Sequence, residues 1–152
     1  MKTPRDYFWM EKAIQLAELA AKNQEVPVGA VLVFNDQLIG EGFNHPISEC
    51  DPTAHAEIIA LRAGAKKINN YRLLNSTLYV TLEPCIMCVG AIVHARVARV
   101  VFGAYDSKAG AVSSVFQIGS TTQLNHVVDY QGGLFADRCG ILLTEFFRER
   151  RK

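Results

Sequence analysis

The stretch from Thr77 to Phe102 reads TLYVTLEPCIMCVGAIVHARVARVVF and indicates a strand, a helix and a second strand in close succession. The run 77–82 is short, apolar and rich in residues that favour strands, and 99–102 has the same character. Between them, Pro84 marks the first turn of a helix from Cys85 to about Ala95. Strands joined by a helix are typical of an α/β protein whose helices pack on the sheet.

The preceding sequence extends this alternation. Asp51-Pro52-Thr53 supplies a cap and a starting proline for a helix from Ala54 to about Lys67. Two apolar runs, 26–34 and 37–43, are joined by Asn35-Asp36, which suits a tight hairpin turn, so they should pair antiparallel. The order of strands and helices predicts an α/β sheet with helices on both faces.

Both ends of the chain are predicted to be helical. Thr3-Pro4-Arg5-Asp6 combines an N-cap, a proline at the first helical position and an acid in the first turn, and it predicts an amphipathic helix over about 4–22. At the other end, 127–130 is a weaker strand, and a helix is expected from Gly132 to about Arg150.

Composition and length favour one folded domain spanning 1–152. With 49% hydrophobic and 20% charged residues the chain lies far from the composition of disordered proteins. Its 16 Lys and Arg against 15 Asp and Glu provide no overall attraction for nucleic acid, so such a partner would need a local patch.

No segment has the character of a membrane anchor or a secretory signal. Residues 1–10 contain Pro4 and Asp6 and lack an uninterrupted apolar run. The 4 cysteines are too few for a disulfide scaffold in a chain with a full-sized core. We therefore expect a cytoplasmic protein with reduced thiols and no membrane partner.

Cys85 and Cys88 are the first chemical signal. Their spacing brings two sulfur atoms within reach of one ion. The helix start at Pro84 also favours thiolate, because backbone N–H groups stabilise negative charge there. Alone, the pair is compatible with a metal site, a redox pair or coincidence.

His55 and Glu57 strengthen the metal interpretation, because they too begin a helix. Residues two apart do not share a lateral helix face, so both can serve one site only beyond the helix end, where the cysteine pair can meet them. His55, Cys85 and Cys88 would leave one tetrahedral position of zinc open to water, whose pKa the ion can lower to about 7. Glu57, beside the metal, would move the proton.

Three motifs resemble the bacterial tRNA-specific adenosine deaminases, a branch of the zinc-dependent cytidine and deoxycytidylate deaminases. They are TAHAEI at 53–58, TLEPCIMC at 81–88 and RVVFGA at 99–104, and the likeness continues to Phe146-Phe147-Arg148. The resemblance implies a three-layer α/β/α fold around a central mixed five-stranded sheet. It also implies one zinc ion per subunit and a homodimer with its sites near the interface.

The activity implied is hydrolysis of the adenosine at the wobble position of a tRNA anticodon to inosine and ammonia. Through the same likeness, Asn44 contacts the flipped base, and Val28 and Phe147 line its pocket. Asp106 lies near the ribose of the preceding nucleotide. Glu57 then takes a proton from water, passes it to a ring nitrogen and protonates the departing amine.

An anticodon stem-loop is the expected partner, because a loop splays a base out more cheaply than a duplex does. Phosphate contacts could come from a basic patch at the C-terminus, made of Arg148, Arg150, Arg151 and Lys152. The same charges also suit a solvated helix end. One departure from the family is Ser113-Ser114, where Gly-Ser is usual; it could alter the loop near RNA.

Several alternatives stay open. The zinc motif also fits a deaminase of free nucleobases or nucleotides of the guanine or cytosine type, or a non-catalytic zinc-bearing RNA-binding module. A structural zinc site would need a fourth ligand, such as Cys50 or Cys139. Asn44 could merely end a strand, and Asp106 could merely cap a turn.

Overall fold

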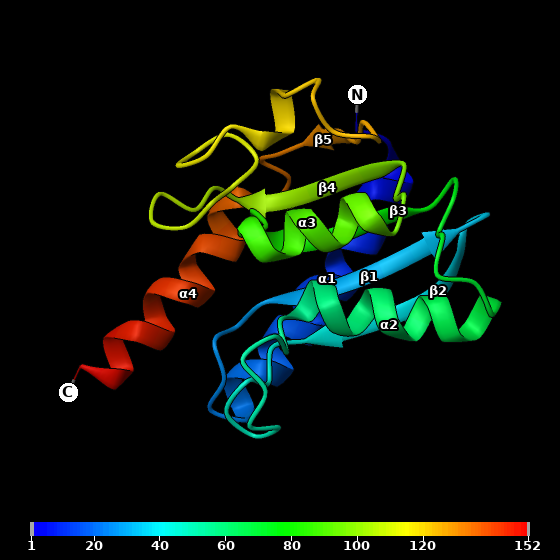
Figure 1. Ribbon diagram of the computed structural model, residues 1–152. Helices are drawn as coiled ribbons and strands as arrows, with labels where there is room; N and C mark the ends of the chain where they lie inside the picture. The colour runs from blue at the N-terminus through cyan, green and yellow to red at the C-terminus, as the bar shows by residue number, and fades with distance from the viewer. Residues whose placement is uncertain (1, 152) are drawn as a thin grey trace.

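A mixed five-stranded sheet lies at the centre of the protein, as the computed structural model shows for residues 2–151 (Figure 1). The elements in chain order are α1 (Pro4–Lys22), β1 (Gly29–Phe34), β2 (Gln37–Phe43), α2 (Ala56–Ile68), β3 (Thr77–Leu82), α3 (Ile86–His94), β4 (Arg99–Ala104), a short 3-10 helix (Ile118–Ser120), β5 (Asp129–Gln131) and α4 (Ala136–Arg150). Within residues 2–151, none of the helices combines the length and the apolar character that a membrane span requires.

The strands lie in the order β2-β1-β3-β4-β5. β1 pairs antiparallel with β2 and β3, whereas β3 with β4 and β4 with β5 are parallel. Asn35 and Asp36 join β1 to β2 with φ of 52° and 57°. A tight hairpin turn requires such positive φ values, and Asn and Asp tolerate them better than most residues do. The predicted antiparallel hairpin is confirmed.

Helices cover both faces of the sheet, which confirms the three-layer α/β/α expectation. In β1, Ala30 and Leu32 pack in the core under α2 and α3, whereas Val31 and Val33 pack in the core under α1 and α4. Alternate residues of a strand point to opposite faces, so a strand buried on both sides is apolar throughout. Figure 1 shows α2 and α3 together on one face and α1 and α4 on the other.

Several predicted boundaries were wrong. The helix predicted from Ala54 begins at Ala56, and the strand predicted over 99–102 ends at Ala104. The first strand begins at Gly29 rather than residue 26, because the Val28 N–H turns back to the Val26 carbonyl. The last strand is 129–131 rather than 127–130.

The final helix begins at Ala136 rather than Gly132. Gly133 and Phe135 have φ of 92° and 55°, and the Leu134 N–H bonds to the carbonyl of Phe102. This left-handed turn ties the chain to β4 before α4 can begin.

Asp6 joins α1 to the sheet. Its carboxylate accepts hydrogen bonds from the guanidinium of Arg99 at 2.8 and 2.7 Å and from the hydroxyl of Tyr79 at 2.7 Å. It also accepts the Thr3 N–H at 2.9 Å, which completes the predicted helix cap. Burial raises the pKa of Asp6, but the hydrogen bonds outweigh it, so the pKa lies well below its usual range.

We expect Asp6→Asn to lower the free energy of unfolding by about 3 kcal/mol at pH 7, because it removes the carboxylate that pairs with the partly buried Arg99. A lowered carboxyl pKa stabilises the fold above the unfolded pKa of about 3.9, and this stabilisation is lost as the pH falls. The difference between wild type and variant should therefore shrink below about pH 4. Urea titrations across pH measure it.

Glu11→Gln is the matched control, because Glu11 pairs with Arg138 on the surface, where both side chains are about half exposed. Its loss should change stability by less than about 1 kcal/mol. Equal effects of the two variants at pH 7 would contradict a special role for Asp6.

Candidate metal centre and active site

Two helix N-termini meet at one point on the α2–α3 side of the sheet. His55 is the N-cap of α2 and Cys85 is the N-cap of α3, each in an extended conformation. Nδ1 of His55 lies 3.6 Å from Sγ of Cys85 and 3.5 Å from Sγ of Cys88. The structure thus brings together the three residues predicted as metal ligands.

The donor set fits zinc. One imidazole nitrogen and two sulfur atoms, all within 4.8 Å of one another, are the ligand types and spacing that zinc prefers. Hydrogen bonds from Cys88 and His55 lower the pKa of Cys85 to about 4, which favours the thiolate that a metal binds. Among residues 2–151, Cys50 and Cys139 lie outside this group, so neither closes the coordination.

Glu57 lies in the first turn of α2, beside the ligand group but not within it. Its side chain is buried, with a residue exposure of 4%, and burial raises its pKa to about 7. A carboxyl group with such a pKa can both accept and donate a proton near neutral pH. Its place fits a proton carrier rather than a ligand.

Asn44 connects the end of β2 to the start of α2. Its N–H bonds to the carbonyl of Val28 at 3.1 Å, and its side-chain Oδ1 accepts the N–H of Ala56 at 2.7 Å. Asn44 therefore does more than end a strand, because it helps cap the helix that carries Glu57. Val28 is buried beside it.

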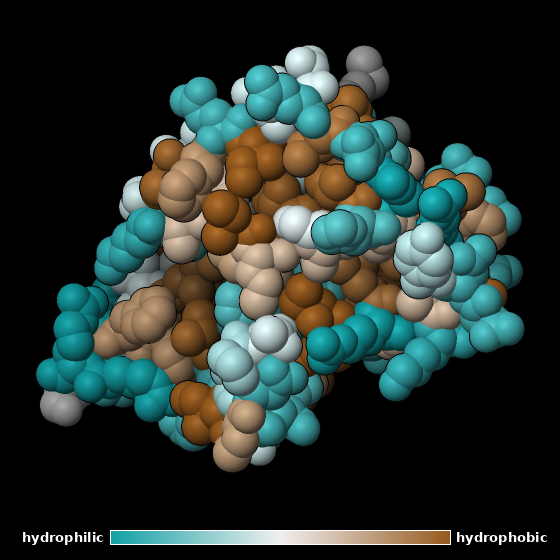
Figure 2. Space-filling model, viewed as in Figure 1, coloured by the Kyte–Doolittle hydropathy of each residue, from teal (hydrophilic) through white to brown (hydrophobic). Residues whose placement is uncertain are grey.

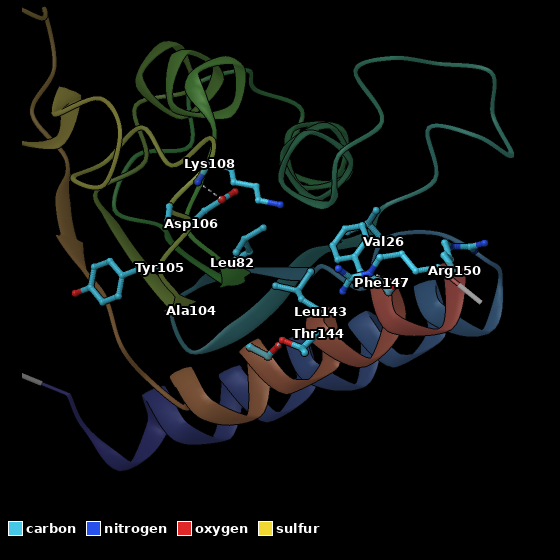
Figure 3. A pocket seen from close by; sticks show the side chains of 13 residues that line it. Val26, Leu82, Ala104, Tyr105, Asp106, Lys108, Leu143, Thr144, Phe147 and Arg150 are labelled. Carbon is cyan, nitrogen blue, oxygen red and sulfur yellow. Dashed lines mark hydrogen bonds between the residues drawn. The ribbon is translucent and has the colours of Figure 1, made fainter.

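Asp106 and Phe147 line one pocket of about 680 Å³ between the segment that follows β4 and α4. Figure 3 shows Asp106 and Lys108 on one side of this pocket and Phe147, beside Val26, on another. Leu82, three residues before Cys85, also lines it. His55, Glu57 and the cysteines are not among the lining residues, so the pocket adjoins the metal centre rather than containing it.

The basic C-terminal residues are only partly available to a ligand. The guanidinium of Arg150 stacks on the ring of Phe146 at 4.2 Å and donates to the carbonyl of Gln24 at 2.7 Å. Arg148 and Arg151 are exposed, and Arg151 also lines the pocket of Phe147. Lys152 lies outside the described residues.

Two buried carboxylates near the site were missed by the sequence analysis. Glu25 accepts the N–H groups of Ile47 and Ser48, in the segment that follows Asn44. Glu83, two residues before Cys85, binds the segment that follows Asp106. The position of Glu83 beside the cysteine motif was the one signal that could have marked it.

The Ser113 substitution is accommodated without backbone strain. Ser113 is not among the non-glycine residues with positive φ, so this position does not require the usual glycine. Its N–H and that of Ser114 both bind Glu83. The departure from the family therefore leaves the loop anchored.

The remaining histidines lie outside the metal group. Nε2 of His126 is 2.7 Å from the carbonyl of Val97, and His94 is exposed at the end of α3. Nδ1 of His45 is buried without a hydrogen-bond partner, while its ring packs on Phe43. Of these three, only His45 lies next to a predicted substrate contact, Asn44.

Comparisons with known proteins agree with this geometry. Residues 3–104 match the cytidine and deoxycytidylate deaminase zinc-binding region. A tRNA-specific adenosine deaminase of Haemophilus influenzae is 55% identical over 144 residues, which cover 94% of this chain and 83% of that protein. A solved structure from work on A-to-I editing by tRNA:A34 deaminases has a TM-score of 0.86 and 40% identity, and the match covers 90% of this chain and 99% of that one.

The fold is shared more widely than the sequence. A solved guanine deaminase from Nitrosomonas europaea has a TM-score of 0.76 at 24% identity, with 96% of this chain and 85% of that chain covered. At this identity the likeness concerns the fold alone. The sequence likeness therefore favours the adenosine deaminases over the guanine enzyme.

Proposed function

Because the chain belongs to the tRNA-specific adenosine deaminases of the zinc-dependent cytidine and deoxycytidylate deaminase family, we propose that it converts the wobble adenosine of a tRNA anticodon to inosine and releases ammonia. The observation that carries this proposal is the group His55, Cys85 and Cys88 with the buried Glu57 beside it. Residues 1–152 act as one deaminase domain, because segments from Val26 to Arg151 contribute to one pocket beside this group.

His55, Cys85 and Cys88 would hold one zinc ion. Such an ion lowers the pKa of water to about 7 and so makes hydroxide available at neutral pH. Glu57 accepts the proton of the attacking water and delivers it to the ring nitrogen next to the amine-bearing carbon. The carboxylate then takes the second proton of the water, from the hydroxyl now bonded to that carbon, and passes it to the amine. The C–N bond breaks, ammonia leaves and a carbonyl forms.

The substrate base enters with its sugar and phosphates along the pocket of Asp106 and Phe147. Oδ1 of Asn44 is occupied by the Ala56 N–H, so its Nδ2 is the group that would donate to the base. Val28 and Phe147 provide apolar contacts, and Asp106 lies where the ribose of the preceding nucleotide would pass. Arg148 and Arg151 are the better candidates for phosphate contacts, since Arg150 is already engaged with Gln24.

The proposed enzyme is a homodimer that acts in the cytoplasm, where its tRNA substrate is found. Figure 2 shows apolar side chains gathered over α3, the helix that carries Cys88 and has Cys85 as its N-cap. Ile86 on this helix is 54% exposed, and Gly90 leaves open space around its Cα. An exposed apolar face of this kind is typical of a contact between subunits. Light scattering in solution measures the oligomeric state.

Inosine formation at the wobble position is the decisive test. We expect the purified protein to convert the wobble adenosine of an anticodon stem-loop to inosine, detected by sequencing, and to leave the same adenosine unchanged in a continuous duplex, because the base must be splayed out. Release of ammonia from free guanine or cytosine compounds without activity on the stem-loop would instead establish the nucleobase deaminase. Cellular tRNA with and without the protein provides the same comparison in vivo.

A further inference from the structure

A single buried carboxylate anchors the loop that carries Asp106. Glu83 follows β3 directly and is 2% exposed. Its two oxygens accept the N–H groups of four loop residues and one hydroxyl. The donors are the N–H of Asp106 at 3.0 Å, of Val112 at 3.1 Å, of Ser113 at 2.9 Å and of Ser114 at 3.1 Å, together with the hydroxyl of Ser114.

The loop also packs directly on the segment that leads to the zinc ligands. The Ala111 N–H bonds to the carbonyl of Pro84 at 2.9 Å, and Cys85 pairs with Gly110 in an isolated bridge. A Cβ at Gly110 would lie 2.4 Å from the carboxylate of Glu83, so only glycine allows this approach. Cys85 is thereby held in two ways: it is the N-cap of α3, and its backbone pairs with Gly110 of the loop.

The carboxylate form of Glu83 suits this anchor, because one of its oxygens accepts two of the five donors and the other accepts three. Hydrogen bonds to an ionised acceptor are about twice as strong as those between neutral groups. A neutral side chain of the same shape could not accept all of these donors.

The anchored loop faces the pocket with the side chains that would meet the nucleic acid. Oδ1 of Asp106 accepts the N–H of Lys108 at 3.0 Å and of Ala109 at 3.2 Å, and these hydrogen bonds close the first turn of the loop. Figure 3 shows Asp106 and Lys108 together at the edge of the pocket that Phe147 lines from another side. The Glu83 contacts, together with the Ala111–Pro84 hydrogen bond and the Cys85–Gly110 bridge, hold this edge near Cys85.

We propose that Glu83 is a positioning residue for the RNA strand: it holds the 106–114 loop at a fixed place relative to the zinc ligands, so that a nucleotide bound beside Asp106 leaves the next base at Glu57. This inference rests on the proposed function, because it assumes a polynucleotide substrate. Glu83 itself touches neither substrate nor metal and acts through the backbone of the loop.

Glu83→Gln tests the proposal with little change of shape. The variant carboxamide has one acceptor oxygen and turns an NH₂ group toward backbone N–H donors, so the loop should detach from it. We expect KM for an anticodon stem-loop to rise about tenfold, with kcat within about threefold of wild type. Zinc content should stay at one ion per chain, and the amides of 112–114 should exchange hydrogen faster.

Ser114→Ala is the second variant, because it removes one hydroxyl donor from an exposed residue and does not threaten the fold. Ser114→Ala should also raise KM, by a smaller factor than Glu83→Gln does. Glu11→Gln, a carboxylate change in the surface pair with Arg138, should leave KM unchanged. An unchanged KM and unchanged exchange at 112–114 in Glu83→Gln would overturn the proposal.

Two other outcomes are also decisive. Loss of zinc together with kcat in Glu83→Gln would show that the residue supports the metal ligands instead, and it would overturn the positioning role. A wild-type protein without activity on the stem-loop would refute the proposed function. The exchange of the 112–114 amides would still report whether Glu83 anchors the loop.

Discussion

Glu57→Gln is expected to abolish turnover while the protein keeps its fold and its zinc. The variant side chain has nearly the same shape but cannot accept or release a proton at neutral pH. Because Glu57 serves both the water and the departing amine, its loss should lower kcat on the anticodon stem-loop by at least about 10³-fold. Glu57→Ala should have the same effect. Single-turnover assays with excess enzyme measure this loss directly.

Measuring the zinc content of the variants distinguishes a catalytic role of Glu57 from a structural one. Glu57 is not part of the ligand group, so both variants should hold as much zinc as wild type. A matched control is Glu49→Gln, which changes an exposed carboxylate and should leave kcat unchanged. Inosine formation by Glu57→Gln at the wild-type rate would mean that another group carries the proton. Intact RNA binding with no dependence on Glu57 would support the non-catalytic binding module.

Local signals allowed most of the fold to be predicted. The Thr3 to Asp6 cap and the Asn35-Asp36 turn depend on neighbouring residues alone, and both were confirmed. The start of α4 was missed because it depends on a distant contact. The N–H groups of Gly133 and Leu134 bond to the carbonyls of Gly103 and Phe102 in β4, and these contacts hold the chain in a turn through Phe135 before it becomes helical.

In the candidate site too, some features could be predicted from local sequence and others depend on distant contacts. His55, Cys85 and Cys88 could be placed together from the sequence, because each motif begins a helix and helix ends can meet beyond a sheet edge. The roles of Glu25 and Glu83 could not be predicted. Most of their partners are backbone N–H groups more than 20 positions away, and a backbone donor leaves no residue type in the sequence to mark it.

Cys88→Ser is expected to remove zinc and activity together. Cys88 is fully buried in the ligand group, with Sγ 3.5 Å from Nδ1 of His55. A serine hydroxyl at this position is a poorer zinc ligand than a thiolate, so zinc content should fall to less than about a tenth of an ion per chain after dialysis. Turnover should fall by at least about tenfold, in proportion to the zinc that is lost. Elemental analysis and the stem-loop assay measure the two quantities on one sample.

Cys50→Ser controls for the loss of a thiol as such, because Cys50 is exposed and lies outside the ligand group. It should keep both zinc and turnover. The pair of Cys88→Ser and Glu57→Gln then separates two kinds of zinc site. A catalytic site predicts that Glu57→Gln loses activity with its metal in place, whereas Cys88→Ser loses both. If Cys88→Ser lost zinc and still deaminated the stem-loop at the wild-type rate, the ion would be structural and the water would have to be activated by protein groups alone.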